Sequence, residues 1–405
     1  MIGKKILFRN KILKELYRED NLSCVDLCVR IHKSFPLMAK LIEELIEDDL
    51  VVETGLAPST GGRRPVTYSI QKDRLYLVSV AMDQFVTKIA IMDMRTQFVL
   101  PIEKIVLPLP GNIKALDILR ENIVNFIEAS GIPKEKLVGI GIGMPGFVDV
   151  KKGINHSYLP LHDTRSITKY ISEKTGLPVF IDNDSSLVAL AELYFGHTHG
   201  EKNAMVVNIG WGIGLGMILN GQLFGGQEGF AGEFSHIPLF LNGKSCWCGK
   251  VGCLETETSL LLIIEKARAG IRAGRSSKIS SLPENDLELS YDSIIHAVQE
   301  GDQFAIELFS KAGYNIGKGV AVLIHILNPK KIILSGRGSS AGQILLAPIQ
   351  QALNEHCISR LYQNTSIEIS TLGINAELIG AAALVMENFE HESINQKTAI
   401  KQAAL

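Results

Sequence analysis

Residues 232–255 read GEFSHIPLFLNGKSCWCGKVGCLE, and they constrain the rest of the chain more than any other segment. His236 precedes three closely spaced cysteines, Cys246, Cys248 and Cys253. One imidazole and three thiolates make a closed tetrahedral set of zinc ligands, and the intervening glycines allow the tight turns that such a set needs. The alternative is three free thiols in a surface loop. We favour zinc, because the three cysteines lie close together with a histidine ten residues upstream. The ion should be structural, because the four ligands leave no position for water.

Acidic and amide side chains flank this segment. Glu233 and Glu255 lie at its two ends, and the run Asp182-Asn183-Asp184 precedes it. Each acid taken singly is typical of a protein surface. Together they fit a polyhydroxy ligand, because every sugar hydroxyl both donates and accepts hydrogen bonds. The cluster therefore predicts a sugar site near the metal loop.

The sequence on both sides of the metal loop alternates β-rich runs with longer helical segments, which indicates an α/β architecture. We expect a helix at 113–129, a buried helix at 319–327, and strands at 75–81, 88–93, 98–107, 137–143, 178–182 and 204–209. Glycines alternate through residues 210–216. They predict a hairpin whose backbone closely approaches either a phosphate group or another part of the core.

The first 74 residues follow a different pattern. Apolar residues at helical spacing predict a helix around 12–17, and Ser23 with Asp26 resembles a capping box that opens a second helix. A third helix begins at Ser34, and a β-rich run at 50–53 then pairs with one at 66–70. Three helices followed by a hairpin are typical of a winged helix-turn-helix, whose third helix enters the major groove of DNA.

Candidate DNA contacts lie at the start of the third helix and in the hairpin loop. They are Lys33, Ser34, Phe35, Leu37 and Lys40 on the helix, and Arg63 and Arg64 on the loop. The two arginines suit phosphates or the minor groove. The helix lacks the Arg, Asn or Gln that usually read base edges. From periodicity alone, a helical protein–protein module is therefore an open alternative.

Composition limits the possible locations of the protein. The chain has 405 residues, a net charge of −2 and 46% hydrophobic residues, as expected for two or three soluble domains. No apolar run reaches the ~18 residues that a membrane helix needs. The N-terminus lacks the apolar core of a signal peptide. We expect a cytoplasmic protein that does not contact a membrane.

At the metal loop the sequence resembles the ROK family, which comprises bacterial sugar kinases and sugar-responsive repressors. The Gly-Glu-x-x-His pattern begins at Gly232, and the Cys-x-Cys-Gly-x-x-Gly-Cys-Leu-Glu pattern ends at Glu255. The resemblance implies a two-lobed, actin-like fold of the hexokinase type with the ligand between the lobes. In kinases of the family, the residue that matches Asp184 takes the proton of the sugar hydroxyl. The resemblance places zinc on His236, Cys246, Cys248 and Cys253, and the sugar among Asn183, Asp184, Glu233, His236 and Glu255, near the 143–146 loop.

Repressors of the family carry a winged helix in front of this fold, ending in a Gly-Gly-Arg-Pro-like linker to which residues 61–65 are similar. The resemblance therefore implies operator DNA as a partner, a sugar or sugar phosphate as effector, and a homodimer or homotetramer. We expect a DNA-binding domain at 1–74, a small α/β lobe at 75–190 completed by a C-terminal helix at about 385–405, and a large lobe with the zinc loop at 191–384.

Three segments depart from the pattern of the family's kinases, and all three concern the nucleotide. The Asp-x-Gly-Gly-Thr turn corresponds here to Asp83-Gln84-Phe85-Val86-Thr87, Trp211 replaces a small hydroxyl residue in the second phosphate loop, and Gly336-Arg337-Gly338 interrupts the glycine run near the adenosine. Bulky and β-branched residues resist positive φ and fill the space of a phosphate. We therefore expect a sugar-binding repressor without catalytic residues. The alternative is an ATP-dependent ROK kinase with an added DNA-binding domain.

Overall fold

The computed structural model describes residues 2–57, 64–161, 165–279 and 282–403. Its contacts divide the chain into two compact units, one of residues 1–187 and 377–405 and the other of residues 188–376. None of the helices within the described residues is both long and apolar enough to cross a membrane.

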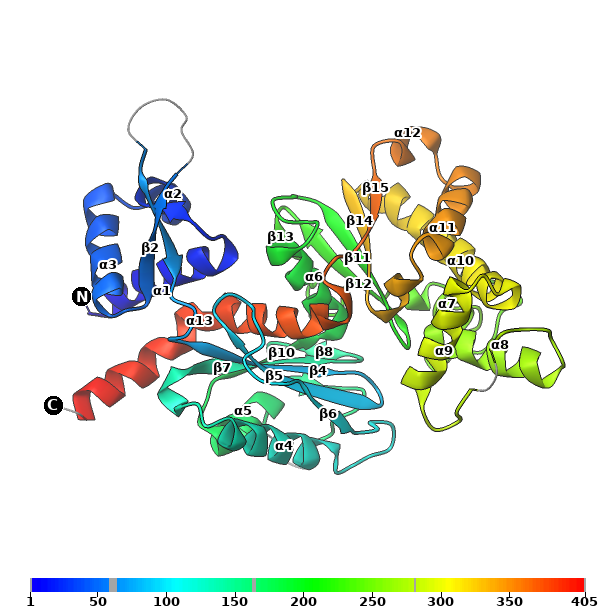
Figure 1. Cartoon of the computed structure of the whole chain (residues 1–405), viewed down its shortest axis with the longest axis horizontal. Helices are drawn as coiled ribbons and strands as arrows, with labels where there is room; N and C mark the ends of the chain where they lie inside the picture. The colour runs from blue at the N-terminus through cyan, green and yellow to red at the C-terminus, as the bar shows by residue number, and fades with distance from the viewer. Residues whose placement is uncertain (1, 58–63, 162–164, 280–281, 404–405) are drawn as a thin grey trace. The chain divides into compact units, whose positions relative to one another are not determined.

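The first unit begins with a winged helix-turn-helix (Figure 1). Its elements are α1 (Ile2–Arg18), β1 (Leu22–Ser23), α2 (Cys24–Ile31), α3 (Phe35–Glu47), β2 (Val51–Leu56) and β3 (Val66–Ile70). The helices enclose a small core that includes Ile12, Leu27 and Leu41. The strands form an antiparallel sheet of order β1-β3-β2, in which β1 is a strand that the sequence pattern did not indicate.

The capping box of α2 is confirmed. The Ser23 hydroxyl accepts a hydrogen bond from the Asp26 amide at 3.2 Å, and the Asp26 carboxylate accepts one from the Ser23 amide at 2.8 Å. Each bond satisfies a backbone donor that has no partner within the helix. The third helix also begins where expected, with Ser34 as its N-cap and proline in its first turn.

A mixed sheet of order β10-β7-β4-β5-β6 follows in the same unit. Its elements, with the small β8-β9 pair, are β4 (Tyr76–Met82), β5 (Val86–Asp93), β6 (Glu103–Val106), α4 (Ala115–Ala129), β7 (Leu137–Met144), β8 (Val148–Asp149), β9 (Ile154–Asn155), α5 (Ile167–Thr175) and β10 (Val179–Asn183). Helix α6 (Asp184–Phe195) begins in this unit and continues into the second. Helices α4 and α5 cover one face (Figure 1). Leu119 and Ile123 of α4 share a buried cluster with Ile140 and Ile142 of β7.

Helix α13 (Ala376–Ala403) covers the opposite face of this sheet, where Leu378 packs with Ala81 and Ala90. The approach is very close: a Cβ on Gly141 would lie 1.9 Å from the carbonyl oxygen of Ala381. The alternating glycines of β7 therefore let the helix backbone rest directly on the strand.

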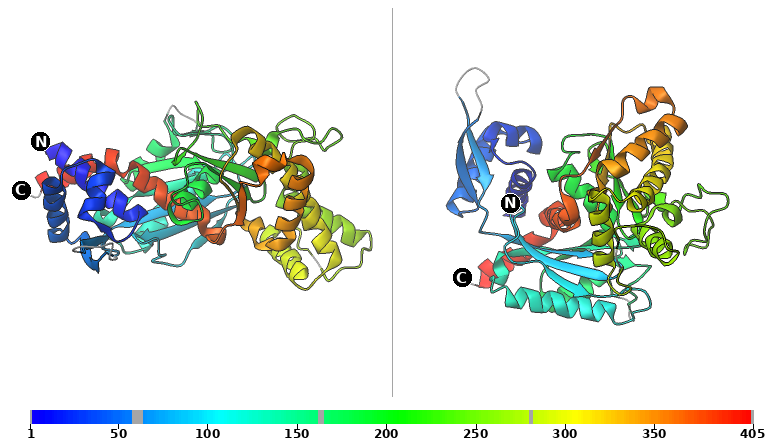
Figure 2. Two further views of the ribbon diagram at one scale, coloured as in Figure 1. Left: turned by 90° about the horizontal axis from the view of Figure 1, so that it is seen from above. Right: turned by 45° about the vertical axis from the view of Figure 1, so that its right-hand side comes forward.

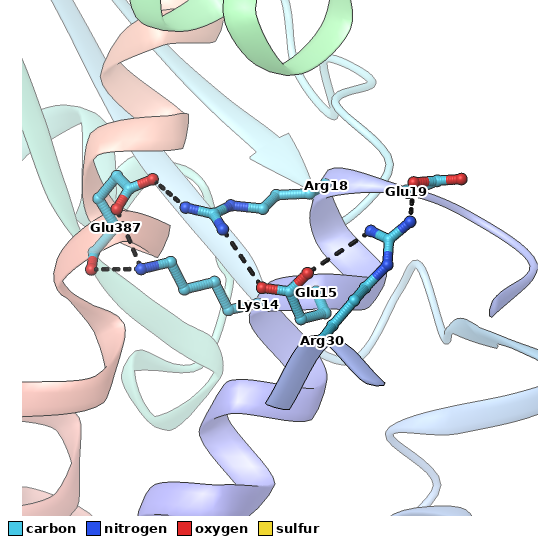
Figure 3. A network of polar contacts seen from close by, with 6 residues as sticks. All are labelled: Lys14, Glu15, Arg18, Glu19, Arg30 and Glu387. Atoms are coloured by element: carbon cyan, nitrogen blue, oxygen red, sulfur yellow. Dashed lines mark hydrogen bonds and ion pairs between the residues drawn. The ribbon is translucent and has the colours of Figure 1, made fainter. Parts of the chain in front are cut away.

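The same helix holds the winged helix domain. Lys14 and Arg18 of α1 both contact Glu387 of α13 (Figure 3). Asn10 of the same helix donates to the Phe389 carbonyl at 3.3 Å. The N-terminal helices and α13 lie side by side in each view of Figure 2. The winged helix domain is therefore attached to a helix that also forms part of the α/β lobe.

The second unit contains a sheet of order β13-β12-β11-β14-β15. Its strands are β11 (Ala204–Ile209), β12 (Ile213–Leu219), β13 (Gln222–Leu223), β14 (Lys331–Ser335) and β15 (Ser366–Ile369), and its helices are α7 (Glu255–Thr258), α8 (Leu260–Arg272), α9 (Leu287–Gln299), α10 (Gln303–Leu327), α11 (Gln343–His356) and α12 (Ser359–Tyr362). Glycines of α10 lie against the α11 backbone, so these two helices pack closely.

Most expected elements are present, and three differ from their predictions. The strand expected at 98–107 is reduced to β6, with Phe98 forming an isolated bridge to Met92, because Pro101 cannot donate to a ladder. The helix expected from 113 begins at Ala115. The C-terminal helix begins at Ala376 instead of near 385. The glycine-rich segment forms the antiparallel β11–β12 hairpin, as predicted.

Candidate functional site

The predicted metal ligands come together in the second unit. One ligand atom from each of His236, Cys246, Cys248 and Cys253 lies within 4.8 Å of the others. Cys246 Sγ is 3.5 Å from His236 Nδ1, and Cys248 Sγ is 3.6 Å from Cys253 Sγ. One nitrogen and three sulfur donors at this spacing fit a tetrahedral soft-metal site.

Short backbone turns bring the cysteines together. The Cys246 amide donates to the Lys250 carbonyl at 2.7 Å, which closes a turn around Cys248. Gly252 adopts φ of +77°, and a Cβ there would lie 1.8 Å from the Phe240 carbonyl oxygen. Only glycine fits this position, so the sequence pattern around the cysteines is a requirement of the turn.

His236 faces two directions. Its Nδ1 points to the cysteine sulfurs, while its Nε2 lies 3.8 Å from a carboxylate oxygen of Glu233. Burial lowers the pKa of His236, which favours the neutral imidazole that a metal binds, although nearby Glu255 acts in the opposite direction. This geometry leaves Nε2 beside Glu233, on the side of the ring away from the sulfurs.

Glu255 begins α7, directly after the metal loop. Its Oε1 accepts a hydrogen bond from the indole nitrogen of Trp247 at 2.9 Å, and a Cβ on Gly212 would lie 2.8 Å from its Oε2. Trp247 also packs edge-on against the His236 ring, with centroids 4.9 Å apart. Sequence reasoning did not assign Trp247 a role, although its place between two metal ligands was a usable signal.

Asn183 and Asp184 belong to the first unit, at the carboxyl end of β10. The Asn183 side chain donates to the Gly146 carbonyl at 3.1 Å and accepts from the Ser185 amide at 2.9 Å. It therefore ties the 143–146 loop to the first turn of α6, and Asp184 is the first residue of that helix. The five predicted sugar residues thus fall into two groups, one in each unit.

Two further residues shape the first group, and the sequence analysis assigned a role to neither of them. Buried Asn155 donates to the Pro145 carbonyl at 3.0 Å and so braces the 143–146 loop from its other side. Glu377, near the start of α13, accepts from the Met82 amide at 3.1 Å. Burial, followed by the charges of Asp184 and Asp83, raises the pKa of Glu377 well above its usual range. The chain folds back across 295 residues to place this carboxyl group, so no local pattern reveals it.

The turn that replaces the first phosphate loop is closed by its own aspartate. Asp83 Oδ1 accepts hydrogen bonds from the amides of Phe85 and Val86 at 2.7 and 2.8 Å. The carbonyls of Gln84 and Phe85 accept from Leu109 and Leu107, which fixes the turn further. Backbone amides that point to an anion are what a phosphate loop supplies, and here a carboxylate already uses two of them.

Bulky side chains gather where the second phosphate loop and the adenosine segment are expected. Trp211 is buried, and its ring meets Tyr291 edge-on with centroids 6.5 Å apart. The Arg337 guanidinium lies 5.1 Å from the Trp211 centroid and forms an ion pair with Glu288. The Tyr291 hydroxyl donates to the Arg337 carbonyl at 2.9 Å. These four side chains therefore form one packed cluster in the second unit.

The predicted DNA-contacting residues of α3 lie mostly at the surface. Lys33, Ser34, Phe35 and Lys40 are exposed, and the Phe35 side chain is 55% exposed. Leu37 is half-buried, so part of its surface belongs to the domain core. A helix N-terminus with two lysines and an exposed aromatic ring has the chemistry to contact phosphates and thymine methyl groups.

The hairpin loop is described only in part. Arg64 donates to the carbonyls of Leu56 at 3.1 Å and Ala57 at 2.6 Å, so its guanidinium ties the base of the loop to β2. Arg63 lies outside the described residues, as do glycines 61 and 62 of the predicted linker.

Comparisons with known proteins place this geometry in context. The model of the ROK family matches residues 87–388. A xylose repressor of Caldicellulosiruptor bescii is 28% identical over 96% of this chain and 94% of its own length. The N-acetylglucosamine repressor of Escherichia coli O157:H7 is 29% identical over 86% and 84%. A glucokinase of Halalkalibacterium halodurans is 35% identical, over 63% of this chain and 78% of its own length.

Solved structures give the same picture. A ROK family transcriptional regulator, a homolog of the E. coli MLC protein, is 27% identical with a TM-score of 0.78, covering 98% of this chain and 99% of that one. A ROK glucokinase from Streptomyces griseus, solved with glucose and AMPPNP, is 24% identical with a TM-score of 0.66, covering 76% of this chain and 98% of its own. The similarity to this kinase structure concerns the fold alone. The regulator extends over the winged helix as well.

Proposed function

The chain belongs to the ROK family, and from this premise we propose that it is a sugar-responsive repressor of transcription. The observation that carries the proposal is the similarity to repressors along 86–96% of the chain, whereas the glucokinase match covers 63%. The exposed N-terminus of α3 supports DNA binding. Two copies of the winged helix would read a palindromic operator, which calls for a homodimer or a homotetramer.

We infer that the protein does not transfer phosphate. Phosphoryl transfer depends almost entirely on positioning the phosphates. The Asp83 carboxylate occupies the amides of Phe85 and Val86, and Trp211 lies in a packed cluster with Arg337. These contacts support a protein that keeps its predicted sugar-binding residues and has lost its phosphate-binding loops.

The proposed effector is a monosaccharide. Xylose, glucose and N-acetylglucosamine are the candidates that the names of the relatives supply. Asp184 would accept a hydroxyl hydrogen bond without acting as a base. The complete proposed sugar set is Asn183, Asp184, Glu233, His236 and Glu255.

The proposed metal is structural zinc, held by His236, Cys246, Cys248 and Cys253. The donor set and its spacing support this assignment. When bound, zinc would supply a fixed cross-link and no reactive water, because all four positions are protein atoms. The backbone turns of the metal loop would then fix the position of Glu255 relative to His236.

Helix α13 offers a route from effector to DNA. Its first turn carries Glu377, beside Asp83 and Asp184, and its fourth contains Glu387, which contacts Lys14 and Arg18 of the winged helix domain. We propose that sugar binding near Asp184 displaces α13 and thereby the DNA-binding domain. Such a switch requires that the sugar binds the two arrangements with different affinity.

Two measurements test the function. Fluorescence anisotropy of a promoter duplex, with and without each of the three sugars, should show salt-dependent binding that one sugar weakens. If calorimetry shows that a sugar binds and the operator affinity stays constant, sugar-responsive repression is overturned. A coupled ADP-release assay should stay silent, and turnover above ~1 per second would favour the kinase alternative.

A further inference from the structure

Trp247 is a large aromatic side chain at the surface of the metal loop. Its side chain is 60% exposed, although it lies between two cysteines of the metal cluster. It is nonetheless held in place, because its indole N–H donates to Glu255 at 2.9 Å and its ring packs edge-on against His236. Both contacts are to residues of the proposed sugar set.

This arrangement has the chemistry of a carbohydrate contact. A sugar ring presents C–H groups on its faces, which pack on aromatic rings, and hydroxyls at its edge, which bond to carboxylates. Trp247 and Glu255 offer these two surfaces side by side. In addition, the indole N–H and a sugar hydroxyl are both donors, so they compete for the same oxygen of Glu255.

Resting on the proposed sugar-binding function, we propose that Trp247 is a sugar-contacting residue that gates Glu255. A sugar hydroxyl displaces the indole N–H from Glu255 Oε1, and the released indole lies with its face against the sugar ring. The short metal loop fixes the backbone on both sides of Trp247, so its movement is a rotation of the side chain alone.

Two substitutions separate the gate from the stacking surface. Trp247→Phe keeps an aromatic face but removes the competing N–H donor, so sugar affinity should rise about two- to tenfold, the effect of one hydrogen bond released. Trp247→Ala removes both and should bind at least threefold more weakly than Trp247→Phe. Because the side chain is exposed, both variants should fold, and metal content and thermal unfolding verify this.

The tryptophans of the chain provide a direct readout, since it has only Trp211 and Trp247. In Trp211→Phe, emission reports on Trp247 alone, and in Trp247→Phe it reports on the buried Trp211. Titration with xylose, glucose and N-acetylglucosamine, followed in parallel by calorimetry, should change the emission of Trp211→Phe at the calorimetric Kd. The emission of Trp247→Phe should remain nearly constant. Without sugar, adding Glu255→Ala to Trp211→Phe should shift the emission, because the indole loses its acceptor.

The outcomes distinguish the two proposals. If a sugar binds by calorimetry and the emission of Trp211→Phe does not change, the gate is wrong and the sugar site stands. Equal affinity of the phenylalanine and alanine variants would also overturn the gate. If none of the three sugars binds, the gate falls together with the sugar site, even when the Glu255→Ala shift confirms the Trp247–Glu255 bond.

Discussion

Arg18 and Glu387 are 369 residues apart in the sequence, yet Arg18 Nη2 lies 2.5 Å from Glu387 Oε1. Lys14 reaches the other carboxylate oxygen at 3.0 Å, and Arg18 also pairs with Glu15 (Figure 3). One glutamate of α13 thus binds two cations of α1. The first and last helices of the chain are joined by partly buried charges, which are worth more than isolated surface pairs.

The first prediction concerns this link. Glu387→Ala should leave Lys14 and Arg18 without their carboxylate and weaken the attachment of the winged helix domain by about 1 kcal/mol. Operator affinity should change less than threefold, while the sugar-induced loss of affinity should shrink. Anisotropy titrations with and without sugar measure both quantities. Glu128→Ala, an exposed glutamate on α4, is the control, and an unaltered sugar response in Glu387→Ala would rule out α13 as the route.

A second prediction concerns the DNA face. Lys40 is exposed on α3, so Lys40→Ala should weaken binding to DNA and lower the slope of log K against log salt by about 1, as expected for one lost phosphate contact. Titrations over roughly 50 to 200 mM salt give the slope, because counterion release dominates the salt dependence of binding in this range. Lys169→Ala on α5 should behave as wild type. An identical slope in both variants would remove Lys40 from the interface.

The metal site gives a third prediction. Purified protein should contain one zinc ion per chain, and Cys248→Ser should lose it. If this variant loses about 2 kcal/mol of its free energy of unfolding, its Tm should fall by roughly 4–8 °C. Cys357→Ala changes a buried cysteine outside the cluster and should keep its zinc. Elemental analysis decides the matter, and a wild-type content near zero would refute the assignment.

The fourth prediction concerns pH. Burial raises the pKa of Asp182 from 3.8 to about 6. The folded state therefore holds a proton that the unfolded state releases, so this group lowers stability as pH rises from about 4 to about 6. Asp182→Asn should remove that loss. The change that the substitution causes in the free energy of unfolding should therefore be more favourable at pH 7.5 than at pH 4, by up to about 3 kcal/mol.

Urea unfolding of wild type and Asp182→Asn at several pH values measures this difference. In wild type, Asp182 accepts a hydrogen bond from the backbone amide of Asn183 at 2.7 Å. The side-chain oxygen of asparagine can accept the same hydrogen bond, so the local geometry is preserved. A difference in unfolding free energy that is independent of pH would show that Asp182 titrates normally.

Local patterns were sufficient where the cause is local. The capping box at Ser23 and the glycine hairpin of β11 and β12 follow from hydrogen bonds and steric limits within a few residues. The clustering of the four candidate metal ligands followed for the same reason, since three of the four lie within eight residues of one another (246–253). By contrast, β1 and the early start of α13 depend on partners far along the chain, and periodicity does not reveal such partners.

The sequence by itself determined the metal loop, the winged helix and the loss of glycine from the first phosphate turn, because each is a matter of residue type at short spacing. Only the tertiary structure decided that Glu377 reaches Met82 and that Trp247 holds Glu255. Those contacts depend on where side chains point after packing. The free energy that fixes them comes from burial across the whole fold, and a linear pattern does not carry it.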